Sequence, residues 1–254
     1  MAMTDSTLAG PAAGGETPRA SFDFSGQHAL VTGGTSGIGL AIAQALRRAG
    51  ATVIAAGLPA PEADHSGLTV APLDVTDNTA VLALLQPLGR LDLLVNAAGV
   101  IRRGDEHDPA VFAQVIDINL NGAMRVASAA LPLLARRGGS VVNVASMLSF
   151  FGGGAVPAYS ASKGGIAQLT KSLAIAWAPQ GIRVNAVAPG WIATPLTQAL
   201  QDDPARSAAV LARTPLGRWG RPEDITGPVL FLASPAAAFV TGVVLPVDGG
   251  YLIA

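Results

Sequence analysis

Hydrophobic positions beyond residue 24 fall into short apolar runs that are separated by longer stretches with a helical period. The runs are rich in Val, Ile and Leu without strict polar alternation, as in strands buried on both faces. They predict strands over 28–32, 52–56, 69–73, 91–96, 140–145, 183–187 and 243–247. The stretches between them predict helices over 37–49, 78–85, 109–136, 158–178, 195–212 and 222–233. This order predicts an α/β fold, with about seven parallel strands in one doubly wound sheet and helices on both faces.

Two segments depart from this rhythm. The link over 57–68 contains Gly57, Pro59 and Pro61, which do not suit a regular helix. We therefore expect a loop there, with at most one turn near 62–65. Residues 1–20 are rich in Ala, Gly, Thr and Pro and lack the pattern of a signal peptide. They predict a flexible tail that precedes a single domain over 21–254.

Composition narrows the possible functions. Half of the residues are hydrophobic, 13% are charged, and the net charge is −1, which offers no basic surface for nucleic acid or an anionic membrane. There are no cysteines, and the three histidines are scattered without metal-ligand spacing. No apolar run reaches the roughly 18 residues needed to span a bilayer. We expect a soluble cytoplasmic protein that acts on a small molecule, without a metal, nucleic-acid or membrane partner.

Tyr159 and Lys163 stand four residues apart within a predicted helix, which places a phenol and an ammonium on one helix face. A cation there favours the phenolate and lowers a tyrosine pKa that is ordinarily about 10. Ser146 directly follows the predicted strand over 140–145. Singly, these residues could be a packed aromatic or a strand-end cap. Together, a hydroxyl beside a tyrosine acid/base indicates carbonyl reduction or alcohol oxidation by a nicotinamide-dependent oxidoreductase.

A glycine-rich turn follows the first predicted strand and opens the first helix. Gly33, Gly37 and Gly39 are spaced G-x-x-x-G-x-G, which differs from the common dinucleotide pattern. Glycines at this position let the backbone approach a pyrophosphate at the positive end of the helix. The turn therefore predicts a Rossmann-type dinucleotide-binding domain.

The end of the second strand indicates which dinucleotide is preferred. Gly57 and Leu58 provide neither an acid for a ribose 2′-hydroxyl nor an arginine for a 2′-phosphate. Only Glu62 and Asp64 carry charge nearby, so the sequence favours NAD, with NADP not excluded. Asp74 ends the third strand, where it could accept a hydrogen bond from adenine or cap the helix over 78–85.

Several motifs in order resemble the classical short-chain dehydrogenase/reductase family over essentially all of 24–254. Residues 32–39 match T-G-x-x-x-G-I-G, and residues 96–99 match N-N-A-G with Ala97 in place of the second Asn. Ser146 and the Tyr159–Lys163 pair match the catalytic Ser and Y-x-x-x-K, Asn119 matches the asparagine that completes the tetrad, and residues 189–194 match P-G-x-x-x-T. The resemblance assigns to the dinucleotide Gly33, Thr35, Ser36, Gly37, Ile38, Gly39, Asp74, Val75, Asn96, Ala97, Ala98, Gly99, Tyr159, Lys163, Pro189, Gly190, Ile192 and Thr194.

The same resemblance implies roles for the tetrad. Tyr159 would exchange a proton with the substrate oxygen, and Lys163 would keep the phenol acidic and bind the nicotinamide ribose. Ser146 would hold the substrate oxygen, and Asn119 would position a water. Family members commonly form tetramers, so a homotetramer is expected.

Segments 99–103, 145–150 and 217–220 resemble the sugar-acid branch of the family. Arg102 and Arg103 could reach a carboxylate, since a guanidinium matches one with two parallel hydrogen bonds, although one of the two is expected in solvent. The residues expected at the substrate are Arg102, Ser146, Met147, Phe151, Tyr159 and Trp191. Met147, Phe150, Phe151 and Trp191 could equally be plain core.

Two other functions compete with sugar-acid oxidation. A 3-oxoacyl-carrier-protein reductase would prefer NADPH and carry a basic docking surface, for which Arg47–Arg48 and Arg136–Arg137 could supply only local charge. A catalytically silent dinucleotide-binding scaffold would be expected to lose part of the tetrad, whereas this chain keeps all of it.

Overall fold

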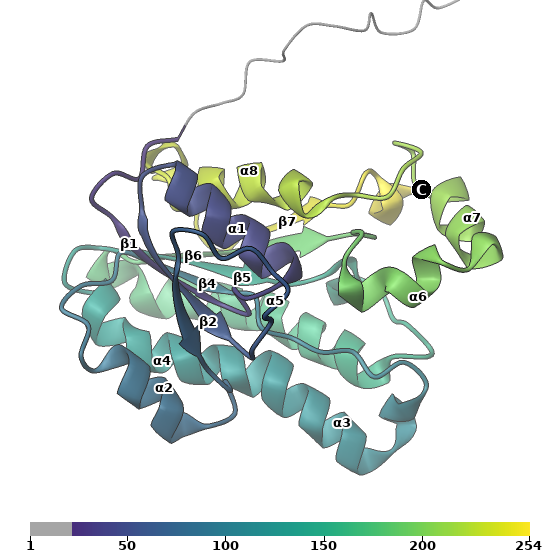
Figure 1. Cartoon of the computed structure of the whole chain (residues 1–254), viewed down its shortest axis with the longest axis horizontal. Coiled ribbons are helices and arrows are strands. Elements are labelled where there is room, and N and C mark those ends of the chain that lie inside the picture. Colours follow the sequence, from purple (N-terminus) through teal and green to yellow (C-terminus); the bar gives the residue numbers. More distant parts are fainter. Residues whose placement is uncertain (1–21) are drawn as a thin grey trace, which may run out of the picture.

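A single seven-stranded parallel sheet organises the computed structural model, which describes residues 22–254 (Figure 1). The predicted tail over 1–20 lies outside the described residues. The strands run in the order β3-β2-β1-β4-β5-β6-β7, and each neighbouring pair is parallel. They are β1 His28–Thr32, β2 Thr52–Gly57, β3 Thr69–Pro72, β4 Leu93–Asn96, β5 Ser140–Val144, β6 Arg183–Pro189 and β7 Val244–Val247. The predicted doubly wound α/β fold is confirmed.

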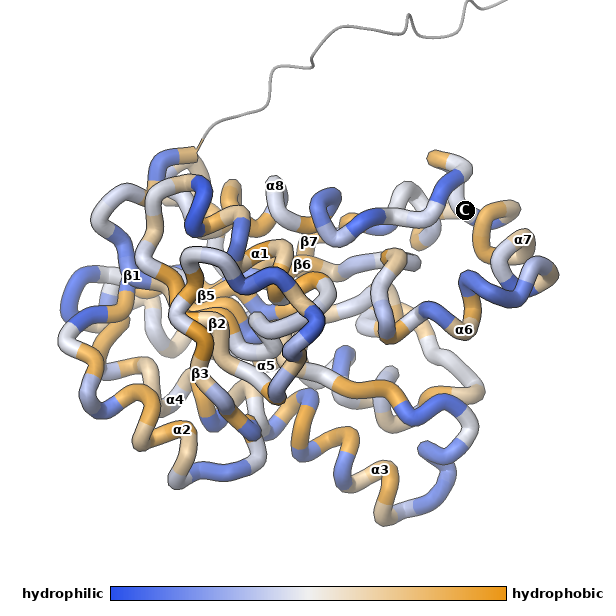
Figure 2. The backbone as a smooth tube through the Cα atoms, viewed as in Figure 1, coloured by the Kyte–Doolittle hydropathy of each residue, from blue (hydrophilic) through white to orange (hydrophobic). Residues whose placement is uncertain are grey.

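Helices cover both faces of this sheet (Figure 1). On one face α1, Gly37–Arg48, and α8, Pro222–Ala233, bury Ile42, Leu46 and Ile225 against the strands. The other face is covered by α2, Asn78–Leu85, α4, Gly122–Leu134, and α5, Pro157–Trp177. The central strands are hydrophobic along most of their length, as Figure 2 shows, because both of their faces are buried, whereas the edge strands β3 and β7 are only partly buried.

The helix predicted over 109–136 is interrupted. The structure has α3, Pro109–Ile116, then one π turn, Asp117–Asn121, and then α4. The amide of Gly122 donates to the carbonyl of Asp117, which closes the wider turn. A π turn inserts one residue without changing the apolar pattern enough to be read, and such turns often mark functional sites.

The helix predicted over 195–212 is also divided. A 3-10 turn, Pro195–Thr197, leads into α6, Gln198–Gln201, and α7 begins anew at Pro204 and ends at Ala212. The carboxylate of Asp203 accepts from the amides of Ala205 and Arg206, and Pro204 lacks the N–H that would continue α6. The prediction missed this Asp-Pro restart signal.

The link over 57–68 contains no helix, as predicted, and is held by side chains of the preceding elements. The Thr35 hydroxyl donates to the carbonyl of Leu58 at 2.8 Å, and His65 Nε2 donates to the carbonyl of Thr35 at 2.9 Å. Gln44 Nε2 donates to the carbonyl of Asp64 at 2.8 Å. Hydrogen bonds thus replace the packing that a crossover helix would give.

Across residues 22–254, no helix is both long and apolar enough to cross a membrane.

Candidate active site

The carboxyl ends of the central strands meet where the strand order reverses, between β1 and β4, and the glycine-rich turn lies there. Gly33 has a φ of +64°, and a Cβ on it would lie 2.7 Å from the amide nitrogen of Ala98. Gly37 has a φ of +53°, and a Cβ on Gly39 would collide with the carbonyl of Gly33. Only glycine fits these positions, so the backbone is left open to a ligand.

The beginning of α1 is free to bind an anion. Ser36 is its N-cap residue, but the Ser36 side chain makes no capping hydrogen bond, so the first amides of this 12-residue helix are not satisfied by it. Ser36, Ile38 and the three glycines line a cavity of about 400 Å³. These features fit the pyrophosphate of a dinucleotide. Thr35 does not line this cavity, and its hydroxyl donates to the carbonyl of Leu58.

The strand-end segment after β4 contributes small residues to the same cavity, which Ala97 and Gly99 line. Ala98 packs into the core instead. Asn96 is buried, and its Nδ2 donates to Asn143 Oδ1 at 3.0 Å, so its side chain ties two strands together. The small residues leave room for a ligand, whereas the Asn96 side chain is directed into the core.

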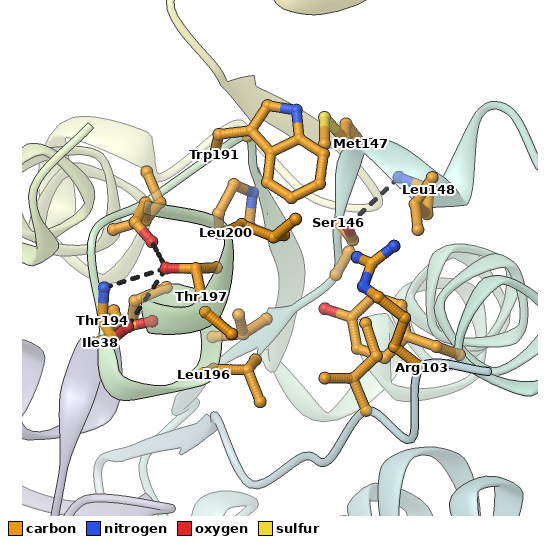
Figure 3. A pocket seen from close by; sticks show the side chains of 18 of the residues that line it. Ile38, Arg103, Ser146, Met147, Leu148, Trp191, Thr194, Leu196, Thr197 and Leu200 are labelled. Carbon is orange, nitrogen blue, oxygen red and sulfur yellow. Dashed lines mark hydrogen bonds between the residues drawn. The ribbon is translucent and has the colours of Figure 1, made fainter. Parts of the chain in front are cut away.

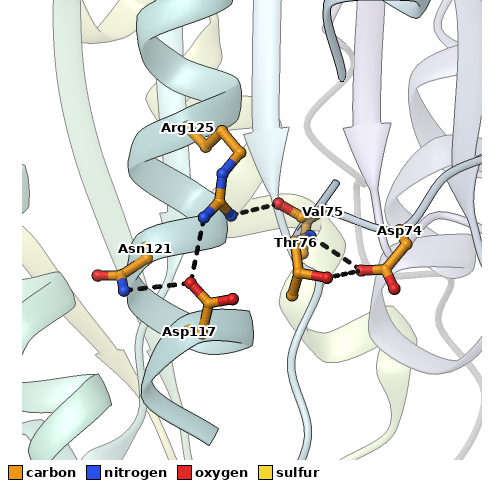
Figure 4. Close-up of polar contacts among 6 residues, drawn as sticks. All are labelled: Asp74, Val75, Thr76, Asp117, Asn121 and Arg125. Atoms are coloured by element: carbon orange, nitrogen blue, oxygen red, sulfur yellow. Dashed lines mark hydrogen bonds and ion pairs between the residues drawn. The ribbon is translucent and has the colours of Figure 1, made fainter. Parts of the chain in front are cut away.

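Asp74 and Val75 follow β3 and are braced against the π turn (Figure 4). Asp74 Oδ1 accepts from the amide and hydroxyl of Thr76, and these bonds hold the pKa of the carboxyl below its ordinary value. Arg125 donates to the carbonyl of Val75 at 2.6 Å and to Asp117 Oδ1 at 3.1 Å. The alternative that Asp74 caps α2 is wrong, because Asp77 accepts from the amides of Thr79 and Ala80.

Tyr159 and Lys163 lie on one face of α5, as their spacing predicts. Lys163 Nζ is 5.5 Å from the centre of the Tyr159 ring and donates to the carbonyl of Val144 at 2.7 Å. The Lys163 side chain is buried and borders the cavity of the glycine-rich turn, which is called the dinucleotide cavity below. Gly99 lies close to the Lys163 ammonium. The helix thus holds the phenol and the ammonium together at the end of β5.

Burial governs the ionisation of both groups. Loss of solvent raises the pKa of Tyr159, the neighbouring Ser146 hydroxyl opposes that rise, and the charge of Glu106 adds to it. Burial also lowers the pKa of Lys163 from 10.5 to about 8. The expectation that Lys163 lowers the pKa of Tyr159 is therefore wrong for this state, because desolvation dominates.

Ser146 lies two residues beyond the end of β5, in an extended conformation, and caps the 3-10 turn Met147–Ser149. Its Oγ accepts from the amide of Leu148 at 3.2 Å, and the hydroxyl of Ser149 donates to the carbonyl of Lys163 at 2.6 Å. Ser146 is therefore both a cap and a pocket residue. The turn locks the serine to α5, so its hydroxyl stays beside Tyr159.

Asn119 lies at the centre of the π turn and is buried. Its Oδ1 accepts from the amide of Val100 at 2.8 Å, and its Nδ2 donates to the carbonyl of Val100 at 2.9 Å and to Ser162 Oγ at 3.1 Å. The side chain thereby fixes the loop after β4 against α5. The structure brings all four predicted tetrad residues to one site.

A second cavity, of about 290 Å³, opens beside Ser146 and Tyr159 (Figure 3). Met147 and Trp191 line it, as predicted, and Arg103 reaches into it from the side opposite Leu196 and Thr197. Arg102 and Phe151 do not line it. Arg102 uses its backbone amide to bind Glu106, and Phe151 packs 6.3 Å from the ring of Tyr251. The choice of Arg102 over Arg103 is thus corrected, because adjacent loop residues point in different directions.

The segment after β6 forms the opposite wall of both cavities. Pro189, Gly190, Ile192 and Thr194 line the cavity beside Ser146, and Thr194 also borders the dinucleotide cavity. Sequence reasoning missed the cavity-lining residues that come from α6, from α7 and from the turn before α6. One of them, Arg206, is a second cation in the lining, besides Arg103. The missed lining residues are Leu196, Thr197, Ala199, Leu200 and Arg206.

Comparison with known families accords with this geometry. A family model described as enoyl-(acyl carrier protein) reductase, of the short-chain dehydrogenase type, matches residues 33–252. The chain belongs to the short-chain dehydrogenase/reductase family. It is an NAD(P)-dependent dehydrogenase that acts on CH–OH groups.

Individual relatives resemble the chain over nearly its whole length. A 2-dehydro-3-deoxy-D-gluconate 5-dehydrogenase of Pseudoalteromonas atlantica is 42% identical over 91% of this chain and 98% of its own. A 3-oxoacyl-[acyl-carrier-protein] reductase of Thermotoga maritima is 41% identical over 90% of this chain and 98% of its own. A solved structure from Agrobacterium tumefaciens, described as a putative 2-deoxy-D-gluconate 3-dehydrogenase with bound NADP, matches with a TM-score of 0.85. It is 44% identical over 93% of this chain and all of that one.

Proposed function

We propose that this protein oxidises a secondary alcohol of a sugar acid, of the 2-deoxy-gluconate or keto-deoxy-gluconate type, and catalyses the reverse reduction. The observation that carries the proposal is Arg103 in the cavity of Ser146 and Tyr159. A guanidinium within a small cavity suits a substrate that carries a carboxylate away from its reacting carbon. The relatives named for gluconate derivatives support the same substrate class.

We propose NAD as the preferred dinucleotide. Residues 57–68 contain Glu62 and Asp64 but no lysine or arginine, so this link offers no permanent positive charge to a 2′-phosphate. The Thr35 hydroxyl is not free to bind that phosphate, because it donates to the carbonyl of Leu58. The Agrobacterium relative holds NADP, so the preference is decided by comparing the two dinucleotides directly.

The proton chemistry of the proposal follows from the tetrad. A nicotinamide dinucleotide held in the cavity of the glycine-rich turn would supply or accept the hydride. During oxidation Tyr159 Oη takes the proton of the substrate hydroxyl, and during reduction it returns that proton. Ser146 Oγ donates to the substrate oxygen and holds it beside the phenol. The buried Lys163 borders the neighbouring cavity, where its ammonium would hold the nicotinamide ribose.

Asn119 contributes by position. Its amide group is committed to Val100 and Ser162, so it holds the π turn and the loop after β4 in fixed relation to α5. We propose that this arrangement places the water through which protons reach Lys163.

We propose that the active unit is a cytoplasmic homotetramer in which residues 22–254 form one catalytic domain. Ile175 on α5 and Phe239 near the carboxyl terminus are 78% and 105% exposed, and such apolar surface suits subunit contacts.

Separate substitution of the two neighbouring arginines by glutamine tests the substrate class. Arg103→Gln should raise KM for a sugar acid about tenfold or more, because a charge-assisted hydrogen bond is lost. KM for an uncharged cyclic alcohol should stay unchanged. Arg102→Gln is the matched control and should leave both values near those of the parent. Equal effects of both variants, or no effect of Arg103→Gln, would contradict the proposal.

The carrier-protein reductase remains the rival activity, because a relative with that name is 41% identical. It predicts turnover of an acetoacetyl thioester with NADPH. Such turnover without activity on sugar acids would replace the proposed function.

A further inference from the structure

One buried carboxylate beside the site has no part in the proposed chemistry. Glu106 lies in the 3-10 turn Asp105–His107 and is 1% exposed. Its Oε1 accepts from the amide of Arg102 and its Oε2 from the amide of Tyr159, both at 2.8 Å. A carboxylate buried this completely is costly unless hydrogen bonds satisfy it, and here two backbone donors do so.

The turn that carries Glu106 is tied to the segment before α5 at two further points. The amide of Gly104 donates to the carbonyl of Ala155 at 2.9 Å, and His107 Nε2 donates to the carbonyl of Gly154 at 3.0 Å. The loop of Arg102 and Arg103 and the beginning of α5 are therefore held as one piece. Glu106 is the buried member of this connection.

We propose that Glu106 is a positioning residue with two effects on catalysis. Its two hydrogen bonds fix the distance between the arginine loop and the Tyr159 phenol, so that a substrate anchored at one end presents its reacting carbon at the other. Its negative charge, bonded to the Tyr159 amide, also disfavours the phenolate, so Glu106 adds to the effect of burial and raises the pH at which Tyr159 becomes a base. The first effect rests on the proposed function; the second requires only the tyrosine.

Several charged groups surround Tyr159, and a test must separate the effect of Glu106 from the effects of the others. Lys163 lies on the same helix, Glu106 on the 3-10 turn, and Arg103 and Arg206 line the shared cavity. The hydroxyl of Ser146 is the uncharged neighbour. Among these groups Glu106 is the one negative charge, and its removal should act in the direction opposite to loss of any cation.

The chain permits a direct titration, because Tyr159 and Tyr251 are its only tyrosines. In a Tyr251→Phe background, phenolate absorbance in the ultraviolet reports Tyr159 alone, without substrate or dinucleotide. Glu106→Gln should lower the apparent pKa of Tyr159 by roughly half a unit or more. Asp105→Asn is the matched control, since Asp105 is exposed in the same turn, and it should leave the titration unchanged. Circular dichroism on the same samples shows that each variant is folded.

A kinetic comparison separates the two effects, and its Glu106→Asp measurement does not depend on the folding of Glu106→Gln. Glu106→Asp keeps the charge but is too short to reach both amides. It should raise KM for a sugar acid about threefold to tenfold, while the pH at which oxidation rises stays that of the parent. Glu106→Gln should raise KM similarly and move that rise to lower pH, also with an uncharged alcohol as substrate.

Two results would overturn the proposal. One is a Tyr159 titration in Glu106→Gln that superimposes on the parent, or an equal shift in Asp105→Asn. The other is a Glu106→Asp enzyme with unchanged KM. Absence of sugar-acid turnover in the parent enzyme, while the Tyr159 titration shifts as expected, counts against the proposed substrate and not against the role of Glu106 in tuning the phenol.

Discussion

Burial, rather than the neighbouring cation, decides the ionisation of the reactive side chains at the residue scale. The pKa of Tyr159 is raised and that of Lys163 is lowered, because each group has lost solvent that would stabilise its charged form. The spacing of the two residues could be read from the sequence, since it requires only a helix. Their pKa values could not, because desolvation depends on what packs around them.

Lys163 therefore makes folding depend on pH. Its pKa is about 8 in the folded state, below the ordinary 10.5, so the unfolded chain binds this proton more tightly. Burial of the lysine thus costs stability below its folded pKa, and this cost disappears as pH rises through 10.5. Lys163→Met should raise the free energy of unfolding of the dinucleotide-free protein by about 1–2 kcal/mol near neutral pH, and by nothing at high pH. Urea unfolding of both proteins at several pH values between neutral pH and pH 10.5 measures this difference in the free energy of unfolding.

A Lys163→Met variant that is less stable than the parent near neutral pH, or whose difference does not change with pH, would show that the ammonium is not destabilising. Lys171→Met, on an exposed position of the same helix, is the control and should show no such pH dependence.

The glycine-rich turn, at the scale of elements, is fixed by close contact and not by sequence pattern alone. Gly33→Ala forces a side chain into a left-handed φ of +64° and against the Ala97–Ala98 backbone. We expect it to lower stability by about 1–3 kcal/mol and to weaken dinucleotide binding at least about tenfold. Gly89→Ala, where a Cβ meets nothing within 4 Å, is the matched control. Calorimetry with the reduced dinucleotide measures both variants.

An unchanged affinity in Gly33→Ala would mean that the dinucleotide does not use this turn.

The elements also show how far sequence reasoning reaches. The seven strands and the helix-free link over 57–68 follow from apolar runs and from the prolines, which act locally. The π turn around Asn119 and the exchange of Arg102 for Arg103 could not be predicted. A π turn shifts the register by one residue, and the course of the arginine loop depends on contacts with distant residues, such as that of Glu106 with the Tyr159 amide.

The active site, at the scale of the whole molecule, is assembled from segments that are far apart in the chain and meet at the carboxyl edge of the sheet (Figure 1). The turn after β1 forms the dinucleotide cavity, the ends of β4 and β5 bring Gly99 and Ser146, and α5 brings Tyr159. The segment from β6 to α7 closes the other wall. Because the two cavities adjoin at Tyr159, we predict that the intact protein binds the substrate carboxylate and the dinucleotide at one site and transfers the proton there.

Initial rates, followed by the absorbance of the reduced nicotinamide, test that prediction most directly. NAD and NADP are compared with gluconate, 2-deoxy-gluconate, a 5-keto sugar acid, a cyclic alcohol and an acetoacetyl thioester. We predict turnover of a sugar acid with NAD preferred, reduced at least about a hundredfold in Tyr159→Phe. Turnover of the thioester with NADPH alone would contradict the sugar-acid assignment, and full activity of Tyr159→Phe would contradict the site itself.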